Sequence, residues 1–282
     1  MGTEVEVIRD LEGRVAVVTG AASGIGRALA SGFAAEGMRV VAADIDEAGA
    51  TETVARIGAD AVARRVDVAD PESVAALADE CFAELGQVDL LVNNAGVFQG
   101  GLSWERSLED WEWTFGVNVY GIIHGLRSFV PRMIAQGTDG HVLNTASVAA
   151  FVAGPSSGPY IVSKCAALSL TECLAHDLAA VGAKIGASVL TPSAFDTGIA
   201  QTAGVRPERF GVDDTEDGKG TAEALAAIVS QGMAPSEAVK PVIDGIRSGE
   251  FLIATRPSYA EQIRNRYDAL LERRLPALIS VD

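Results

Sequence analysis

Short apolar runs alternate with longer amphipathic runs along nearly the whole chain. Short continuous apolar runs are typical of strands buried on both faces of a parallel sheet, and apolar positions at helical spacing are typical of helices. The pattern predicts strands at residues 15–19, 39–44, 61–67, 88–93, 141–145, 184–191 and 251–254, and helices at residues 27–36, 47–57, 71–85, 104–121, 161–180, 221–231, 236–248 and 257–274. This alternation predicts one α/β domain, a doubly wound parallel sheet of roughly seven strands with helices on both faces.

A glycine-rich turn lies between the first predicted strand and the first predicted helix. It reads Thr19-Gly-Ala-Ala-Ser-Gly-Ile-Gly26. In a strand–turn–helix arrangement, such a turn points backbone N–H groups and the positive end of the helix dipole at a phosphate. Gly20 permits the tight turn, Gly24 permits close approach of a pyrophosphate, and Gly26 permits close packing of the helix on the strand. The turn therefore predicts a dinucleotide site.

Asp44 ends the second predicted strand, 20 residues after Gly24. A carboxylate at this place accepts hydrogen bonds from ribose hydroxyls and repels a 2′-phosphate. No lysine or arginine occupies the glycine-rich turn, where Ser23 stands. Both features favour NAD over NADP. The alternative is a solvent-exposed aspartate at the start of the next helix.

The candidate chemistry lies between Ser147 and Lys164. Tyr160 and Lys164 are four residues apart on a predicted helix, so their side chains share one face. A nearby ammonium group favours the phenolate and is expected to lower the tyrosine pKa from its usual value near ~10. The pair is therefore a candidate general acid/base for a proton on a substrate oxygen. Ser147 follows a predicted strand, where its hydroxyl can hold the same oxygen.

This trio, with the turn upstream, resembles the short-chain dehydrogenase/reductase family over about residues 13–255. The family's Asn-Asn-Ala-Gly occurs at residues 93–96, and its proline with a threonine five residues later occurs at Pro192 and Thr197, although Ser193 replaces the usual glycine. The resemblance implies a Rossmann-type fold and assigns Asn118 to a proton relay with Lys164. Together with the turn and Asp44, it gives these expected cofactor contacts: Gly20, Ser23, Gly24, Ile25, Gly26, Asp44, Ile45, Asp67, Val68, Asn94, Ala95, Gly96, Tyr160, Lys164, Pro192, Phe195 and Thr197.

The resemblance implies an NAD-dependent oxidoreductase acting on an alcohol or the corresponding ketone. Mostly apolar residues near the expected site favour a hydrophobic secondary alcohol over a polyol, and the candidate substrate contacts are Gln99, Phe151, Ser157 and Ile199. An NADPH-dependent carbonyl reductase and a dinucleotide-binding sensor without catalysis are the alternatives. The family also implies a homo-oligomer, a tetramer or a dimer.

We divide the chain into a polar leader (1–12), a catalytic domain (13–256) and a helical C-terminal extension (257–282). Within the domain, residues 198–220 read as an irregular loop over the substrate. Longer irregular segments of this kind often cover a binding site.

Composition narrows the partners. The formal net charge of −16 argues against nucleic acid and anionic membranes. The three cysteines, Cys81, Cys165 and Cys173, have no metal or disulfide spacing and are expected to be buried thiols, and the three histidines are expected to be structural, so no metal site is predicted. The N-terminus shows no signal peptide, and no apolar run has the length of a membrane helix. We therefore expect a cytoplasmic protein.

Overall fold

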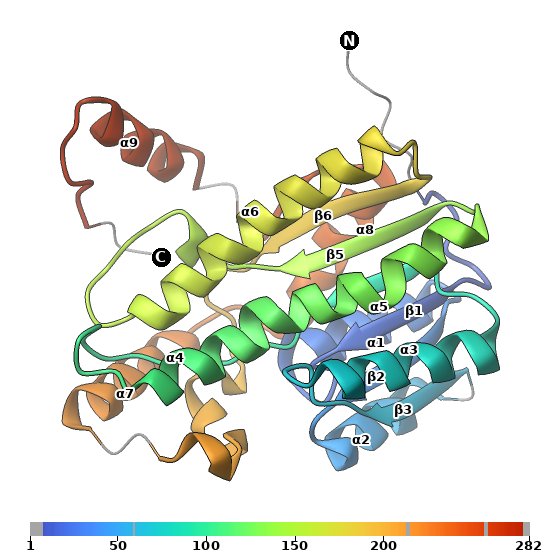
Figure 1. The fold of residues 1–282 in the computed structure, drawn as a ribbon, viewed down its shortest axis with the longest axis horizontal. Helices are drawn as coiled ribbons and strands as arrows, with labels where there is room; N and C mark the ends of the chain where they lie inside the picture. The colour runs from blue at the N-terminus through green and yellow to red at the C-terminus, as the bar shows by residue number, and fades with distance from the viewer. Residues whose placement is uncertain (1–7, 59, 213–214, 257–258, 279–282) are drawn as a thin grey trace.

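Seven parallel strands form one sheet in the computed structural model, which describes residues 8–58, 60–212, 215–256 and 259–278 (Figure 1). The spatial order of the strands is β3-β2-β1-β4-β5-β6-β7, so the chain changes its direction of travel between β1 and β4. This confirms the predicted doubly wound sheet. The strand bounds are β1 (Val15–Thr19), β2 (Arg39–Asp44), β3 (Ala61–Arg65), β4 (Leu90–Asn93), β5 (Gly140–Thr145), β6 (Ile185–Thr191) and β7 (Leu252–Ala254).

Helices cover both faces of the sheet. Successive residues of a strand point to opposite faces, so Val18 packs in a core with Phe33 and Ile246, while Val17 packs in a second core with Phe129. The first core holds α1 and α8, and the second holds α3, α5 and α6. The α-helix bounds are α1 (Gly24–Ala35), α2 (Glu47–Ile57), α3 (Pro71–Leu85), α4 (Leu108–Phe115), α5 (Gly121–Gln136), α6 (Gly158–Ala180), α7 (Glu216–Val229), α8 (Val239–Ser248) and α9 (Tyr259–Leu271).

The predicted helix at residues 104–121 has the wrong bounds. Helix α4 begins only at Leu108, after a capping box between Ser107 and Asp110, and it continues through one π-helical turn, η1 (Gly116–Tyr120), directly into α5. Gly121 does not stop the helix. A Cβ at that residue would lie 3.0 Å from a methyl group of Val68, so glycine allows the helix to approach the turn after β3.

The region after β6 is more ordered than its polar sequence predicts. Residues 198–220 contain two 3₁₀ helices, η3 (Gly198–Val205) and η4 (Glu208–Phe210), and the first turn of α7. The Thr215 hydroxyl caps α7 by accepting a hydrogen bond from the Gly218 N–H. Two further short 3₁₀ helices are η2 (Val148–Ala150) and η5 (Pro235–Ala238).

The two ends of the chain lie differently relative to the sheet. Ile8 and Leu11 are fully buried in the core beside α1 and α8, so the described part of the leader is not merely polar. Residues 1–7, 257–258 and 279–282 of the leader and the extension lie outside the described residues. Figure 1 shows α9 apart from the layers of the sheet, although Tyr259 and Ala269 are buried.

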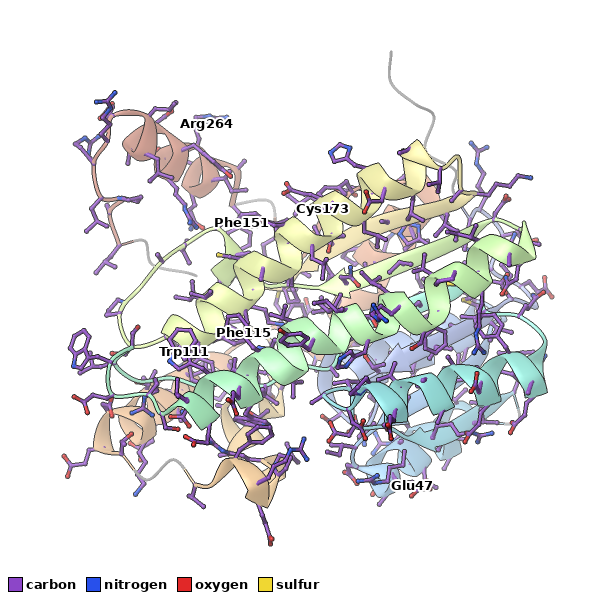
Figure 2. The ribbon with its side chains drawn as sticks, in the orientation of Figure 1. Glu47, Trp111, Phe115, Phe151, Cys173 and Arg264 are labelled. Atoms are coloured by element: carbon purple, nitrogen blue, oxygen red, sulfur yellow. The ribbon has the colours of Figure 1, made fainter. Side chains whose placement is uncertain are left out.

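The cysteines have three different environments. Cys81 is buried, and burial raises the pKa of its thiol to about 12. Cys165 is half-buried and Cys173 is exposed on α6 (Figure 2), so the prediction of buried thiols is wrong for Cys173. None of the helices in the described part of the chain is both long and apolar enough to cross a membrane.

Candidate active site

A cleft of about 750 Å³ lies along the carboxyl ends of the strands. This is the edge at which open α/β sheets bind ligands, beside the point where the strand order reverses. All the predicted cofactor contacts line the cleft, together with Ser147 and two of the predicted substrate contacts, Ser157 and Ile199. Asn118, Gln99 and Phe151 are not among the residues that line it.

The glycine-rich turn fits the dinucleotide site that its sequence predicts. Gly20 has a φ of +68°, which favours glycine, and a Cβ at Gly26 would lie 2.1 Å from the Gly20 carbonyl oxygen. Helix α1 therefore begins against the end of β1, at Gly24, with its first N–H groups at the cleft. Ser23 precedes the helix, and its side chain makes no capping hydrogen bond. A helix start of this kind can hold an anion such as a pyrophosphate.

Carboxylates line the other side of the same end of the cleft. The two oxygens of Asp44 accept hydrogen bonds from the backbone N–H groups of Ala22 (2.8 Å) and Asp46 (3.0 Å), which fixes the carboxylate at the end of β2. Burial raises the pKa of Asp44, and these backbone hydrogen bonds oppose that rise. Asp67, after β3, accepts a hydrogen bond from the Ala69 N–H at 3.0 Å.

The predicted trio converges at the opposite end of the cleft. Tyr160 and Lys164 lie on the first turns of α6, where Pro159 is a favourable residue for a helix start. The Lys164 Nζ lies 5.7 Å from the centre of the Tyr160 ring and donates a hydrogen bond to the Thr145 carbonyl at 3.1 Å. Ser147, just after β5, lines the cleft with them, and its hydroxyl accepts a hydrogen bond from the Ala149 N–H at 3.1 Å.

The pKa of Tyr160 differs from the expectation. Burial raises the pKa of this phenol above 10, and the nearby Ser147 side chain lowers the pKa in part, whereas Lys164 is not a cause of the shift. Burial also lowers the pKa of Lys164 to about 8. The predicted lowering by Lys164 is therefore wrong for the protein alone, because burial disfavours the charged forms of both groups.

Asn118 lies in the π-helical turn and ties three segments together. Its Oδ1 accepts a hydrogen bond from the Val97 N–H at 2.8 Å, and its Nδ2 donates to the Val97 carbonyl and the Ser163 hydroxyl, both at 2.9 Å. The side chain is 1% exposed. Asn118 thus joins the π turn to the segment after β4 and to the helix that carries Tyr160. Its role in a proton relay with Lys164 stays a prediction.

The cleft has a cover, which we define as residues 198–212 and 215–229. Buried charges attach the cover to α4: Arg206 contacts Asp110 at 2.6 Å, and both side chains are 5% exposed. Arg206 also donates to the Gln99 side chain at 3.1 Å, which places Gln99 in this network and not in the cleft. Asp217, at the start of α7, pairs with Arg106 at 2.8 Å.

Several lining residues were not predicted. Trp113 lines the cleft, and the Arg206 guanidinium lies 5.1 Å from the centre of its ring. Leu225, Ile228 and Val229 line the cleft from one face of α7, and their spacing of three and four residues is the signal that shows such a face in a sequence. Leu278, near the C-terminus, has no comparable signal.

Phe151 lies away from the cleft, in contrast to the prediction. It is 8% exposed, and Figure 2 shows it on the side of the molecule where α9 lies. The neighbouring Ala150 carbonyl accepts a hydrogen bond from Arg266 of α9 at 3.2 Å. Figure 2 also shows Trp111 and Phe115 on α4, where their rings pack 6.0 Å apart.

The fold and the cleft define a Rossmann-type protein with a dinucleotide site at the carboxyl edge of its sheet. The family model described as short chain dehydrogenase matches residues 14–207. The chain belongs to this family of oxidoreductases, which bind NAD or NADP.

Curated relatives and a solved structure extend the match over most of the chain. A "C alpha-dehydrogenase" of Sphingobium sp. is 32% identical over 95% of this chain and 89% of its own. A "1-deoxy-11-beta-hydroxypentalenate dehydrogenase" of Streptomyces exfoliatus is 41% identical over 79% of this chain and 80% of its own. The crystal structure of a short-chain dehydrogenase/reductase from Burkholderia phymatum in complex with NAD is 40% identical, with a TM-score of 0.94, and the match covers 97% of this chain and 99% of that one.

Proposed function

We propose that this protein is an NAD-dependent dehydrogenase that transfers hydride between a hydrophobic secondary alcohol and nicotinamide, with Tyr160 as the general acid/base. One observation carries the proposal. Tyr160, Ser147 and Lys164 line one end of a cleft whose other end has the glycine-rich turn, and the Lys164 Nζ lies 5.7 Å from the centre of the Tyr160 ring. One cavity thus contains Tyr160, which can exchange a proton, and the glycine-rich turn, which can hold a dinucleotide phosphate.

The residues divide the work of alcohol oxidation between them. The Tyr160 phenolate takes the hydroxyl proton while the C–H bond of the alcohol breaks and a carbonyl forms. Ser147 donates a hydrogen bond to the substrate oxygen. The bound dinucleotide supplies the hydride acceptor and, when oxidised, a positive charge that favours the phenolate. Lys164, held by the Thr145 carbonyl, adds a cation beside the Tyr160 ring and would hold the ribose of a bound cofactor.

The acidic end of the cleft supports NAD over NADP. The Asp44 carboxylate is fixed by backbone hydrogen bonds, and Asp67 lines the same end. A 2′-phosphate at this end would meet negative charge, while ribose hydroxyls would find hydrogen-bond acceptors. A structural relative named as a gluconate 5-dehydrogenase holds NADP at low occupancy, so both cofactors belong in the test.

Apolar side chains from distant parts of the chain support a hydrophobic substrate. Beside Tyr160, the cleft is lined by Phe98, whose ring lies 5.1 Å from the Tyr160 ring. Val152, Ile199, Leu225, Ile228 and Leu278 also line it. A polyol would leave its hydroxyls without partners against such a surface. The relatives named as dehydrogenases above support the same reaction class.

The proposal is tested by following NADH formation by purified protein with primary, secondary and bulky cyclic alcohols. We expect turnover with NAD, and much less with NADP. Tyr160→Phe should keep NAD affinity and lose turnover by roughly 10²- to 10⁴-fold, the usual contribution of a general acid/base. Tyr267→Phe is the matched control, because Tyr267 is 62% exposed on α9. Near-normal turnover of Tyr160→Phe would overturn the assignment.

Two other results would change the function. Carbonyl reduction with NADPH and no preference for NAD would identify a carbonyl reductase. Tight NAD binding without turnover in either direction would favour a sensor. A homo-oligomer and a cytoplasmic location are further parts of the proposal, supported by the family resemblance and by the three free cysteines, and light scattering tests the first of these.

A further inference from the structure

The cover crosses the full width of the cofactor cleft. It leaves the sheet after β6 and reaches the turn after β3, where the Arg209 guanidinium contacts the Asp67 carboxylate at 3.3 Å. Five strand spacings separate β6 from β3, which amounts to roughly 24 Å at about 4.8 Å per strand. A segment that begins at the catalytic end therefore reaches Asp67, which lines the same end of the cleft as Asp44.

Arg209 also differs in charge from its surroundings. The described residues that line this end include three carboxylates, Asp44, Asp46 and Asp67, while Lys164 and Arg209 are the basic residues that line the described cleft. Lys164 lies at the catalytic end. Arg209 is thus the cation available to the half of the cleft where the anionic dinucleotide would meet acidic side chains.

The backbone on both sides of Arg209 is held in place. Arg206 is paired with buried Asp110 and donates a hydrogen bond to the Phe210 carbonyl, and the Phe210 ring packs against the Arg209 guanidinium at 4.6 Å. The Arg209–Asp67 pair itself is half open to solvent, with side chains 55% and 17% exposed. Such a pair contributes little to folding stability. Its position across the cleft gives it a different use.

We propose that Arg209 retains the cofactor: its pair with Asp67 holds the cover over the adenosine half of the dinucleotide, so release requires this pair to open. The inference rests on the proposed function, because it assumes that the cleft takes NAD. It assigns Arg209 to cofactor binding and not to the chemical step. The specific consequence is that residue 209 controls the rate of NADH release from a site whose catalytic end it does not touch.

The test measures cofactor release directly. NADH bound to the protein is displaced by excess NAD in a stopped-flow instrument, and the loss of NADH fluorescence gives the release rate. We expect Arg209→Gln to release NADH about two- to five-fold faster than wild type, the size expected for an exposed ion pair, and Arg209→Lys to fall between them. ADP-ribose should lose affinity by a similar factor, because it fills the adenosine half alone.

Arg132→Gln is the matched control. Arg132 pairs with Asp79 between α5 and α3, with side chains 43% and 66% exposed, so this variant removes the same charge away from the cleft. We expect it to release NADH at the wild-type rate. In a cycle with Asp67→Asn, the double variant should release NADH no faster than Asp67→Asn alone, since the pair is already open.

Each result separates the two proposals. Equal release rates for wild type, Arg209→Gln and Arg132→Gln would overturn the retention role while leaving the dehydrogenase intact. An affinity loss confined to NADP would also overturn it and would assign Arg209 to a 2′-phosphate. Failure of the wild-type protein to bind NADH at all would overturn the proposed function, and the retention role with it.

Discussion

The floor and the cover of the cleft are built on different principles. The floor, which we define as the strand ends with residues 20–26, 93–96 and 147–164, is fixed by the sheet and by close backbone contacts such as Gly26 against Gly20. The cover is fixed by side chains, chiefly the buried pair of Arg206 and Asp110. In the proposed function, the reacting groups therefore lie on rigid elements, and the residue proposed to retain the cofactor lies on a segment attached by a few charges.

The largest effect on activity is expected when the positive charge of Lys164 is removed from the floor. In Lys164→Met we expect alcohol turnover to fall by roughly 10²- to 10³-fold. The variant also loses the cation that lies beside the Tyr160 ring, 5.7 Å from its centre. Because the Lys164 pKa is lowered to about 8, the wild-type side chain is mostly charged only below that pH, and the difference should be largest there. A pH–rate profile of kcat/KM measures both effects.

Lys184→Met is the control for this prediction. Lys184 precedes β6 at the opposite edge of the sheet and is exposed, so its variant should keep the wild-type profile. A Lys164→Met profile that falls uniformly at all pH values would show that the residue acts only through cofactor binding.

A single methyl group added at Gly26 of the floor should destabilise the protein. In Gly26→Ala, the new Cβ would lie 2.1 Å from the Gly20 carbonyl oxygen and 2.6 Å from the Asn94 amide, so the turn must move. We expect a loss of about 3 kcal/mol in the free energy of unfolding, together with weaker NADH binding. Urea unfolding and NADH fluorescence titration check the two parts. Unchanged NADH affinity would contradict the site assigned to the turn.

Breaking the buried pair of Arg206 and Asp110 should destabilise the attachment of the cover to α4. Arg206→Met leaves Asp110 buried with a weaker set of partners, namely Arg106 at 3.7 Å and the Ser107 N–H. We expect a cost of about 2 kcal/mol, below the usual range for breaking a buried pair because these partners remain. If the cover opens on its own, the KM for the alcohol should rise more than kcat falls.

Asp110→Asn provides the second arm of that experiment. The double variant Arg206→Met/Asp110→Asn should lose less free energy of unfolding than the sum of the two single variants. With both side chains replaced, neither is left as a buried charge without its partner. Additive costs would show that the two side chains stabilise the protein separately.

The same contrast explains what the sequence could predict. Most cleft residues of the floor were predicted, because glycines, Asp44 and the Tyr160–Lys164 pair lie at fixed distances from strand ends. Arg206 and Asp110 are 96 positions apart, and a pairing across such a separation has no local pattern. Asn118 was found by resemblance, but its hydrogen bonds to Val97 and Ser163 depend on how three segments pack. The pKa of Tyr160 was misjudged because burial cannot be read from spacing.

The smallest effect should come from a glycine of the cover. Gly220 lies in α7 with open space where a Cβ would stand and no left-handed backbone, so alanine fits there. Alanine favours a helix over glycine by about 0.5–1 kcal/mol. If the cover opens as a separate unit, Gly220→Ala should slow amide hydrogen exchange in α7 by about two- to five-fold and leave exchange in β1 and β4 unchanged. Gly232→Ala is a control with the opposite expected result. Its new Cβ would lie 2.7 Å from the Ala194 backbone, so this variant should speed amide exchange at the base of the cover. Slower exchange in the sheet as well as in α7 would instead show that the floor and the cover unfold together. The two regions would then differ in the contacts that hold them but not in their free energy of unfolding.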